Sequence, residues 1–195
     1  MKRLLPLLLA ASCRTVEDDL ESIRAERMRI ERRLQVAADA PVWVSEGENA
    51  FDQFVRDDDA QVPDFIYDHV ARRLGERKDE SIRAETREGF DPAKCLADPA
   101  AFRGRFWRVA GRIVRVWPEP LDAGAPVSRV FAGVFYPEKG FPVFFHVIEK
   151  PDALELLKDT VEIDGLFVKV IRYTTPSGRT VTAPFFMARS VRRLM

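Results

Sequence analysis

Histidine and cysteine are scarce in this chain of 195 residues, and so are the motifs of the common enzyme classes. The chain has two histidines, His69 and His146, and two cysteines, Cys13 and Cys95. Two histidines cannot supply a three-histidine metal site, and no P-loop, GxSxG, HExxH or dinucleotide-binding fingerprint is present. We therefore expect a protein that has no catalytic activity and needs no metal or cofactor.

Long apolar runs are also missing. No segment has the ~20 consecutive apolar residues that a membrane-spanning helix needs. A short run from Leu4 to Ala11, interrupted by Pro6, follows the positive pair Lys2-Arg3 and precedes the small residue Ser12. Positive charge, a short apolar run and small residues in this order are typical of an export signal. A buried N-terminal helix is the alternative.

The segment Leu9-Ala10-Ala11-Ser12-Cys13 resembles the lipobox of bacterial lipoproteins. The resemblance implies that residues 1–13 are a leader, that lipid is attached to Cys13 and that Cys13 becomes the mature N-terminus. Because Ala10 stands where lipoproteins prefer leucine, cleavage by ordinary signal peptidase is the alternative. Arg14 is not the aspartate that favours inner-membrane retention in enteric bacteria. We therefore expect a protein of the bacterial cell envelope, facing the periplasm, at the outer membrane rather than the inner.

Lipid on Cys13 leaves Cys95 as a single thiol, which cannot form an intramolecular disulfide. The surrounding segment Pro92-Ala93-Lys94-Cys95-Leu96 predicts a short helix, and we expect the cysteine to be buried. No neighbouring histidine or other base suggests a nucleophile.

The formal net charge is zero, but the charge is divided along the chain. Residues 14–100 carry 14 basic and 22 acidic residues, a net charge of −8, whereas residues 101–195 carry 15 and 9, a net charge of +6. A basic domain suits nucleic acid, anionic glycans or lipid headgroups. Alternatively, the acidic helices dock on the basic domain and neutralise it.

Residues 14–38 predict an amphipathic stalk helix. Apolar residues recur every three or four positions on one face, at Val16, Leu20, Ile23, Ile30 and Leu34. Arg27 lies on the same face and the pattern lasts fewer than three heptads, which is too little to predict a coiled coil. An apolar helix face must be buried against another surface. We therefore expect residues 16–34 to contact the C-terminal domain, a second copy of the chain or another envelope protein.

The segments before the strands predict a linker and short helices. Residues 39–62 lose the helical period and form a linker, with a short helix near Phe51 to Val55. Residues 63–102 form short helices. The first starts at Pro63, carries Ile66, Val70 and Leu74 on one face, and ends near Gly75. His69 adjoins that face and is interpreted as a packed or solvated residue. Asp91-Pro92 and Asp98-Pro99 each combine a capping residue with a helix-starting proline.

Residues 103–195 alternate between apolar and polar side chains. The pattern predicts strands over 105–117, 127–136, 141–148, 161–171 and 180–188, and a short helix from Pro151 to Leu157. Within the first strand the apolar positions change parity, from Val109 and Ile113 to Val114 and Val116, close to Gly111. This change predicts a bulge or bend that lets one strand serve both sides of a closed sheet.

This order of strands and helix resembles the OB fold. Gly111 in the first strand strengthens the resemblance, as does the run Val161-Glu162-Ile163-Asp164-Gly165, which is similar to the V-x-V-x-G run of OB domains. Arg103-Gly104 is similar to an "RG" turn before such a barrel in uncharacterised exported bacterial proteins. The expected fold class is therefore α+β, with N-terminal helices followed by a five-stranded OB-type β-barrel over 103–195. An SH3-like barrel is the competing fold.

The resemblance implies a ligand surface on the second and third strands, rimmed by the loops 118–126 and 173–179. Aromatic and cationic residues that could face it combine stacking with positive charge, as single-strand binders do. These candidate binding residues are Arg129, Phe131, Tyr136, Phe144, His146, Tyr173 and Arg179. The alternative is that most of the aromatics are core residues.

Three functions remain from the sequence. The first is a lipid-anchored binding or scaffolding module without catalytic activity, whose partner is an envelope protein, peptide or glycan. The second is a single-strand nucleic-acid-binding protein, if the N-terminus is not an export signal. The third and least supported is an enzyme that uses His146 with Glu162 or Asp164.

Overall fold

The computed structural model of the protein describes residues 55–57, 62, 64–121, 125–138, 140–174 and 178–194. The predicted leader with Cys13, the stalk helix over 14–38 and most of the linker over 39–62 lie outside these residues. None of the helices within the described ranges is both long and apolar enough to span a membrane.

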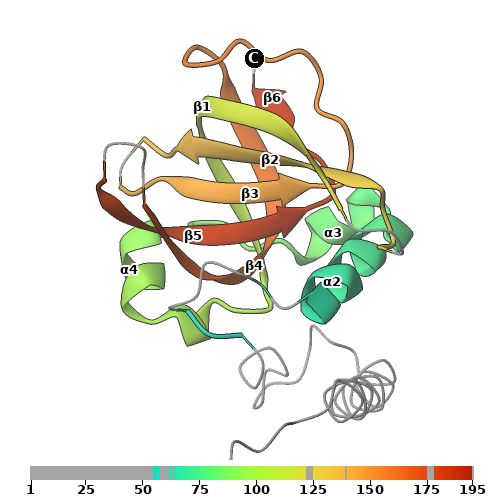
Figure 1. The fold of residues 1–195 in the computed structure, drawn as a ribbon, viewed down its shortest axis with the longest axis horizontal. Helices are drawn as coiled ribbons and strands as arrows, with labels where there is room; N and C mark the ends of the chain where they lie inside the picture. The colour runs from blue at the N-terminus through green and yellow to red at the C-terminus, as the bar shows by residue number, and fades with distance from the viewer. Residues whose placement is uncertain are drawn as a thin grey trace, which may run out of the picture. The chain divides into compact units, whose positions relative to one another are not determined.

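Short helices precede the strands in the described part of the chain (Figure 1). They are α2 (Asp64–Glu76), α3 (Asp79–Glu85), α4 (Pro92–Ala97) and the 3-10 helix η2 (Pro99–Ala101). The predicted caps are confirmed. The Asp91 carboxylate accepts hydrogen bonds from the Ala93 and Lys94 N–H groups, and the Asp98 carboxylate accepts one from Ala101 N–H.

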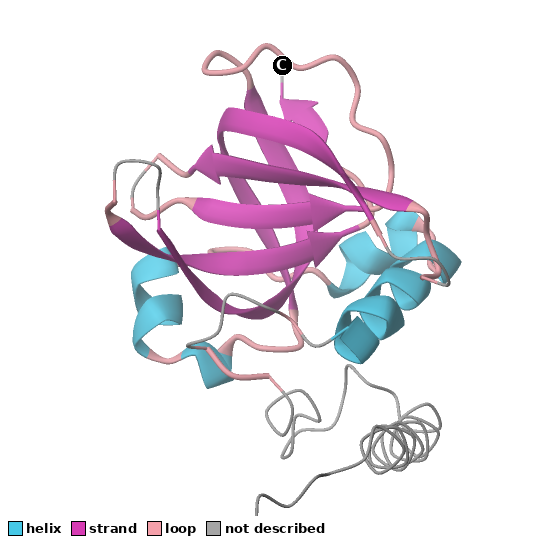
Figure 2. Cartoon of the chain, viewed as in Figure 1, coloured by secondary structure: helices cyan, strands magenta, loops and turns pink. Residues whose placement is uncertain are grey.

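Six strands follow, and five of them pair in a closed ring (Figure 2). The strands are β1 (Phe106–Pro120), β2 (Arg129–Tyr136), β3 (Val143–Val147), β4 (Thr160–Thr174), β5 (Thr180–Ala188) and β6 (Arg192–Leu194). Their order is β1-β2-β3-β5-β4, and β4 pairs back with β1. β3 and β5 are parallel, whereas the other neighbours, including β4 with β6, are antiparallel. The chain is thus an α+β protein.

β1 takes part in both sides of the ring. Its residues 106–112 pair with β4 and its residues 112–120 pair with β2. The register shifts between Ile113 and Arg115, so Val114 is an extra residue, and the predicted irregularity is confirmed. Gly111 is required nearby, because a Cβ atom there would lie 2.5 Å from the carbonyl oxygen of Tyr136.

The interior of the ring is filled by phenylalanine and aliphatic side chains. Phe135, Phe145, Phe167 and Phe186 are all fully or almost fully buried there. Cys95 of α4 belongs to the same cluster and is fully buried, as predicted. Burial raises the pKa of the Cys95 thiol, which makes it a poor nucleophile.

The helix predicted from Pro151 to Leu157 is wrong. Residues 151–155 have no regular structure and residues 156–158 form a turn. The Leu157 N–H donates a hydrogen bond to the Ile113 carbonyl oxygen at 2.7 Å, so this segment is tied to β1 instead of forming helical bonds. Leu154 packs against the interior cluster. The short strand β6 was not predicted either.

The outer side of β4 and β5 is covered by α2 and α3. Ile66, Val70 and Leu74, the predicted apolar face of α2, are buried in a second cluster with Leu166 and Met187. The end of the predicted linker belongs to the same layer, because Val55 is buried there. Asp57 accepts a hydrogen bond from Val170 N–H at 2.9 Å and forms an ion pair with the buried Arg103.

Candidate functional site

The outer face of β1, β2 and β3 carries the polar and aromatic side chains of interest. Strand register places Trp117 opposite Ala132, and Ala132 opposite His146. In the next row Arg115 lies opposite Val134, and Val134 opposite Phe144. Opposing residues of an antiparallel pair share a face. These rows therefore form one continuous surface.

Helix α2 covers one part of this surface through Tyr67. The Tyr67 hydroxyl lies 2.6 Å from His146 Nδ1, and the two rings meet edge to face. His146 Nε2 lies 3.8 Å from a Glu119 carboxylate oxygen. Burial lowers the pKa of His146 to about 4, and it raises the pKa of Tyr67, with the charge of Glu119 adding to that rise. Both groups are therefore neutral near pH 7.

The β1–β2 part of the face lies beside this contact and holds exposed charged and aromatic groups. We call Arg112, Arg115, Trp117 and Tyr136 the open surface. Arg112 and Arg115 are exposed, Trp117 is half-buried and Tyr136 is 47% exposed. The Arg115 guanidinium lies over the Trp117 ring, 4.9 Å from its centroid. Arg112 is paired with Tyr136 in the strand register.

Three of the predicted binding residues come together at one end of this face. The rings of Phe144 and Tyr173 are 4.6 Å apart. Tyr136 stands two residues beyond Val134, the partner of Phe144, and is therefore a diagonal neighbour of Phe144 on the same face. Burial raises the pKa of Tyr173, and the charge of Tyr136 adds to the rise. The open surface therefore continues into an aromatic group from β2, β3 and β4.

The other predicted binding residues are placed differently. Phe131 packs against the interior cluster, because residues 131, 133 and 135 of β2 point into the ring. Arg129 is exposed at the opposite end of β2 from Tyr136, seven residues and thus about 23 Å away. His146 lies on the expected face but is held by Tyr67. Arg179 is exposed just before β5.

The open surface includes residues that the sequence analysis did not select. Arg115 and Trp117 were assigned to the first strand, with no role on the ligand face. The parity change at Val114 was the available signal, because a bulge places both residues on the outer side. No sequence pattern pointed to Tyr67, because its hydrogen bond with His146 depends on how α2 packs on the sheet.

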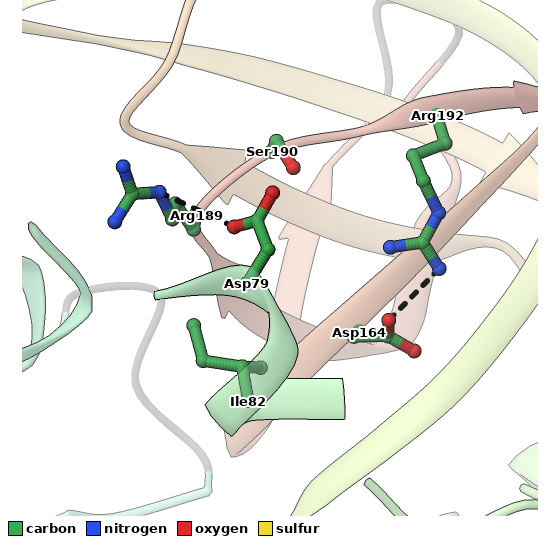
Figure 3. A pocket seen from close by; sticks show the side chains of 6 residues that line it. All are labelled: Asp79, Ile82, Asp164, Arg189, Ser190 and Arg192. Atoms are coloured by element: carbon green, nitrogen blue, oxygen red, sulfur yellow. Dashed lines mark hydrogen bonds and ion pairs between the residues drawn. The ribbon is translucent and has the colours of Figure 1, made fainter. Parts of the chain in front are cut away.

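A second polar cluster lies between α3, β4 and β6 (Figure 3). The buried carboxylate of Asp164 accepts hydrogen bonds from Arg108 Nε at 2.9 Å and Arg192 Nη2 at 2.8 Å. Burial raises the pKa of Asp164, but these hydrogen bonds outweigh burial and hold it below its usual value. The recess beside the cluster, lined also by Asp79 and Arg189, measures about 10 Å³, which holds at most one water molecule. The cluster fastens elements together and has no room for a substrate.

Acidic residues before the strands neutralise several cations of the basic domain. Asp57 pairs with Arg103, Asp79 with Arg189 at 3.2 Å, and Glu88 with Arg108 at 2.8 Å. Part of the positive charge of residues 101–195 is therefore neutralised by acidic residues before the strands, of which Asp79 lies in α3 and the other two lie outside the helices. In the described ranges no group of three or more His, Cys, Asp or Glu side chains is arranged to hold a metal ion.

Comparison with known proteins gives no assignment, since no family model and no curated protein matches this chain.

Proposed function

We propose that the five-stranded ring is an OB-type β-barrel and that the chain is a lipid-anchored, non-catalytic binding or scaffolding module of the bacterial cell envelope. The strand order, the parallel pairing of β3 with β5 and a first strand that pairs with both β2 and β4 support the barrel. The charged start, the short apolar run and Cys13 support export and lipid attachment at the periplasmic side of the envelope.

The ligand contacts the open surface and the neighbouring rings of Phe144 and Tyr173. The observation that carries this proposal is the Arg115 guanidinium stacked on Trp117 at the uncovered part of the face. A stacked guanidinium keeps its N–H groups available for a carboxylate or phosphate, and the indole offers a flat apolar contact. A protein, peptide or glycan with an anionic group beside a ring or an apolar group suits this arrangement.

Recovery of a partner from detergent-solubilised envelopes tests the ligand surface. The anchored protein is compared with its Trp117→Ala and Arg115→Gln variants, and with Arg105→Gln as a control. Arg105 is exposed before β1, and its substitution removes the same charge outside the open surface. We expect the wild type and the control to recover the same partner, and the two variants to recover on the order of tenfold less, as for interface hot spots. Equal recovery by all four proteins, or no specific partner in several detergents, contradicts the proposal.

Single-stranded nucleic acid is the alternative ligand, favoured by the same Arg115–Trp117 stack and by the net charge of +6 over residues 101–195. This alternative requires that residues 1–13 are not cleaved and that the protein is not attached to the membrane. Such a protein would retard a labelled oligonucleotide, and added salt would weaken the complex steeply. A membrane-bound protein with no such retardation decides against it.

A further inference from the structure

The connection between β3 and β4 presents two adjacent leucines on a tight turn. Leu156 is 48% exposed and Leu157 is 64% exposed. We call this pair the leucine knob. Figure 1 shows the connection at the end of the sheet where the C-terminus lies, away from α2 and α4. Contact with an apolar environment would remove both leucine side chains from water and would therefore be favourable.

The knob is held rigidly and under strain. Leu157 has a φ of 64° and is the one non-glycine residue with positive φ in the part of the chain described. Glycine or asparagine adopts this conformation at lower cost than leucine. The turn is nevertheless fixed, by hydrogen bonds from Leu157 N–H to Ile113 O at 2.7 Å and from Glu155 N–H to Asp159 Oδ2 at 2.8 Å. Because this backbone conformation is costly for leucine, the exposed Leu157 side chain is a candidate for a binding role.

Cations accompany the knob. Lys158 follows it directly, its side chain is 76% exposed, and it pairs with Glu155 at 2.8 Å. Arg193 of β6 is 51% exposed and pairs with the buried Asp159 at 3.1 Å. Lys158, Asp159 and Arg193 line a common recess beside the turn. Long basic side chains next to exposed leucines are able to reach headgroups while the leucines enter the acyl region.

We propose that Leu156 and Leu157 insert into the surface of the bilayer that anchors the protein. The inference rests on the proposed function, because it requires lipid on Cys13. Two exposed leucines suit a bilayer, which adapts to their shape, better than a protein partner, which must supply a matching pocket. Lys158 and Arg193 are the basic groups at this turn that can reach lipid headgroups, because their side chains are 76% and 51% exposed.

The chain between the anchor and the domain is long enough for this contact. Residues 14–54 separate Cys13 from Val55, which makes 41 residues. Even at the 1.5 Å rise per residue of an α-helix, the most compact of the common regular conformations, a chain of this length reaches about 60 Å. A folded domain of this size measures roughly 40 Å across. The tether therefore lets the knob reach the bilayer, and it keeps the local lipid concentration high enough for a weak second contact.

Fluorescence quenching in vesicles tests the insertion. The lipidated chain with Leu156→Cys is labelled with an environment-sensitive fluorophore and reconstituted into vesicles of phosphatidylcholine, alone or mixed with phosphatidylglycerol, whose acyl chains are brominated. Cys95 is fully buried and does not compete for the label. Ala84→Cys, at an exposed position of α3, is the matched control. Flotation of the vesicles reports the anchor separately.

We expect several-fold stronger quenching at position 156 than at position 84, and a further Leu157→Ser substitution should reduce it. Stronger quenching with phosphatidylglycerol would support the contribution of Lys158 and Arg193. Equal quenching at both positions in protein that floats with the vesicles overturns the insertion and leaves the lipid anchor intact. A chain that does not float has no lipid anchor, which overturns the proposed function together with the insertion.

Discussion

Tyr67 and His146 form a hydrogen bond between α2 and the outer face of β3. His146 is largely buried by this contact, and its pKa falls to about 4 because burial disfavours the charged ring. In the unfolded chain the same ring titrates near 6.5. The unfolded state therefore binds more protons than the folded state between these two values.

This difference predicts a loss of stability on acidification. The contribution of His146 is complete above pH 6.5 and decreases as the pH falls toward 4, by at most about 3 kcal/mol. Urea unfolding from pH 7 to pH 4 measures it. His146→Asn should flatten the dependence in this window. The slope left in the variant includes His69, whose pKa is also lowered, by burial first and then by Arg73 and Arg72. An unchanged slope in the variant would contradict the assignment to His146.

At the scale of elements, the carboxylate of Asp57 helps to fasten the segment before α2 to the sheet. Asp57 pairs with Arg103, which is only 4% exposed, and also accepts the Val170 N–H. Arg103 in turn donates a hydrogen bond from Nε to the Val168 carbonyl oxygen at 3.1 Å. Val168 is the extra residue of the β4 bulge between Phe167 and Lys169. The ion pair thus connects the entry of the domain to the irregular part of β4.

Substitution of Asp57 should destabilise the domain. Asp57→Ala removes a neutralising partner of a buried cation and the acceptor for Val170 N–H. We expect a loss of about 2–4 kcal/mol, at or below the usual range for a buried pair because the Asp57 side chain is 32% exposed. Asp57→Asn keeps an acceptor oxygen and should lose less. Asp152→Asn, at an exposed loop position, is the control. The shift of the urea midpoint gives the magnitude, and equal midpoints for all of these proteins would show that the pair contributes nothing.

At the scale of the whole molecule, several of the opposite charges of the two parts of the chain pair within the folded domain and are not available to a ligand. Asp79 and Glu88 lie outside the ring and neutralise Arg189 and Arg108 of the strand region. Exposed pairs of this kind contribute little individually. The uncovered Arg112 and Arg115 therefore account for the anionic preference of the proposed ligand surface.

The proposed location gives a direct prediction for the intact protein. Mass analysis of the mature N-terminus should find an acylated Cys13, with residues 1–13 represented by this cysteine alone. Cys13→Ser should move the protein from the membrane fraction to the soluble fraction. An intact Met1 on cytosolic protein would contradict both export and anchoring, and would favour the nucleic-acid alternative.

The sequence by itself determined the features that depend on local pattern. Alternating side chains located the five ring strands to within a few residues, and the parity change near Gly111 predicted the irregularity of β1. The caps at Asp91 and Asp98 and the buried Cys95 follow in the same way from short-range chemistry.

Only the tertiary structure decided which side chains share a surface. The segment with Leu154, Leu156 and Leu157 has a helical pattern, but the bond from Leu157 to Ile113 and the packing of Leu154 on the interior override its local preference. The side taken by Phe131 depends on strand register, and the protonation state of His146 depends on the docking of α2. These contacts join residues far apart in the chain, and the packing that selects them has no signature in a local window of sequence.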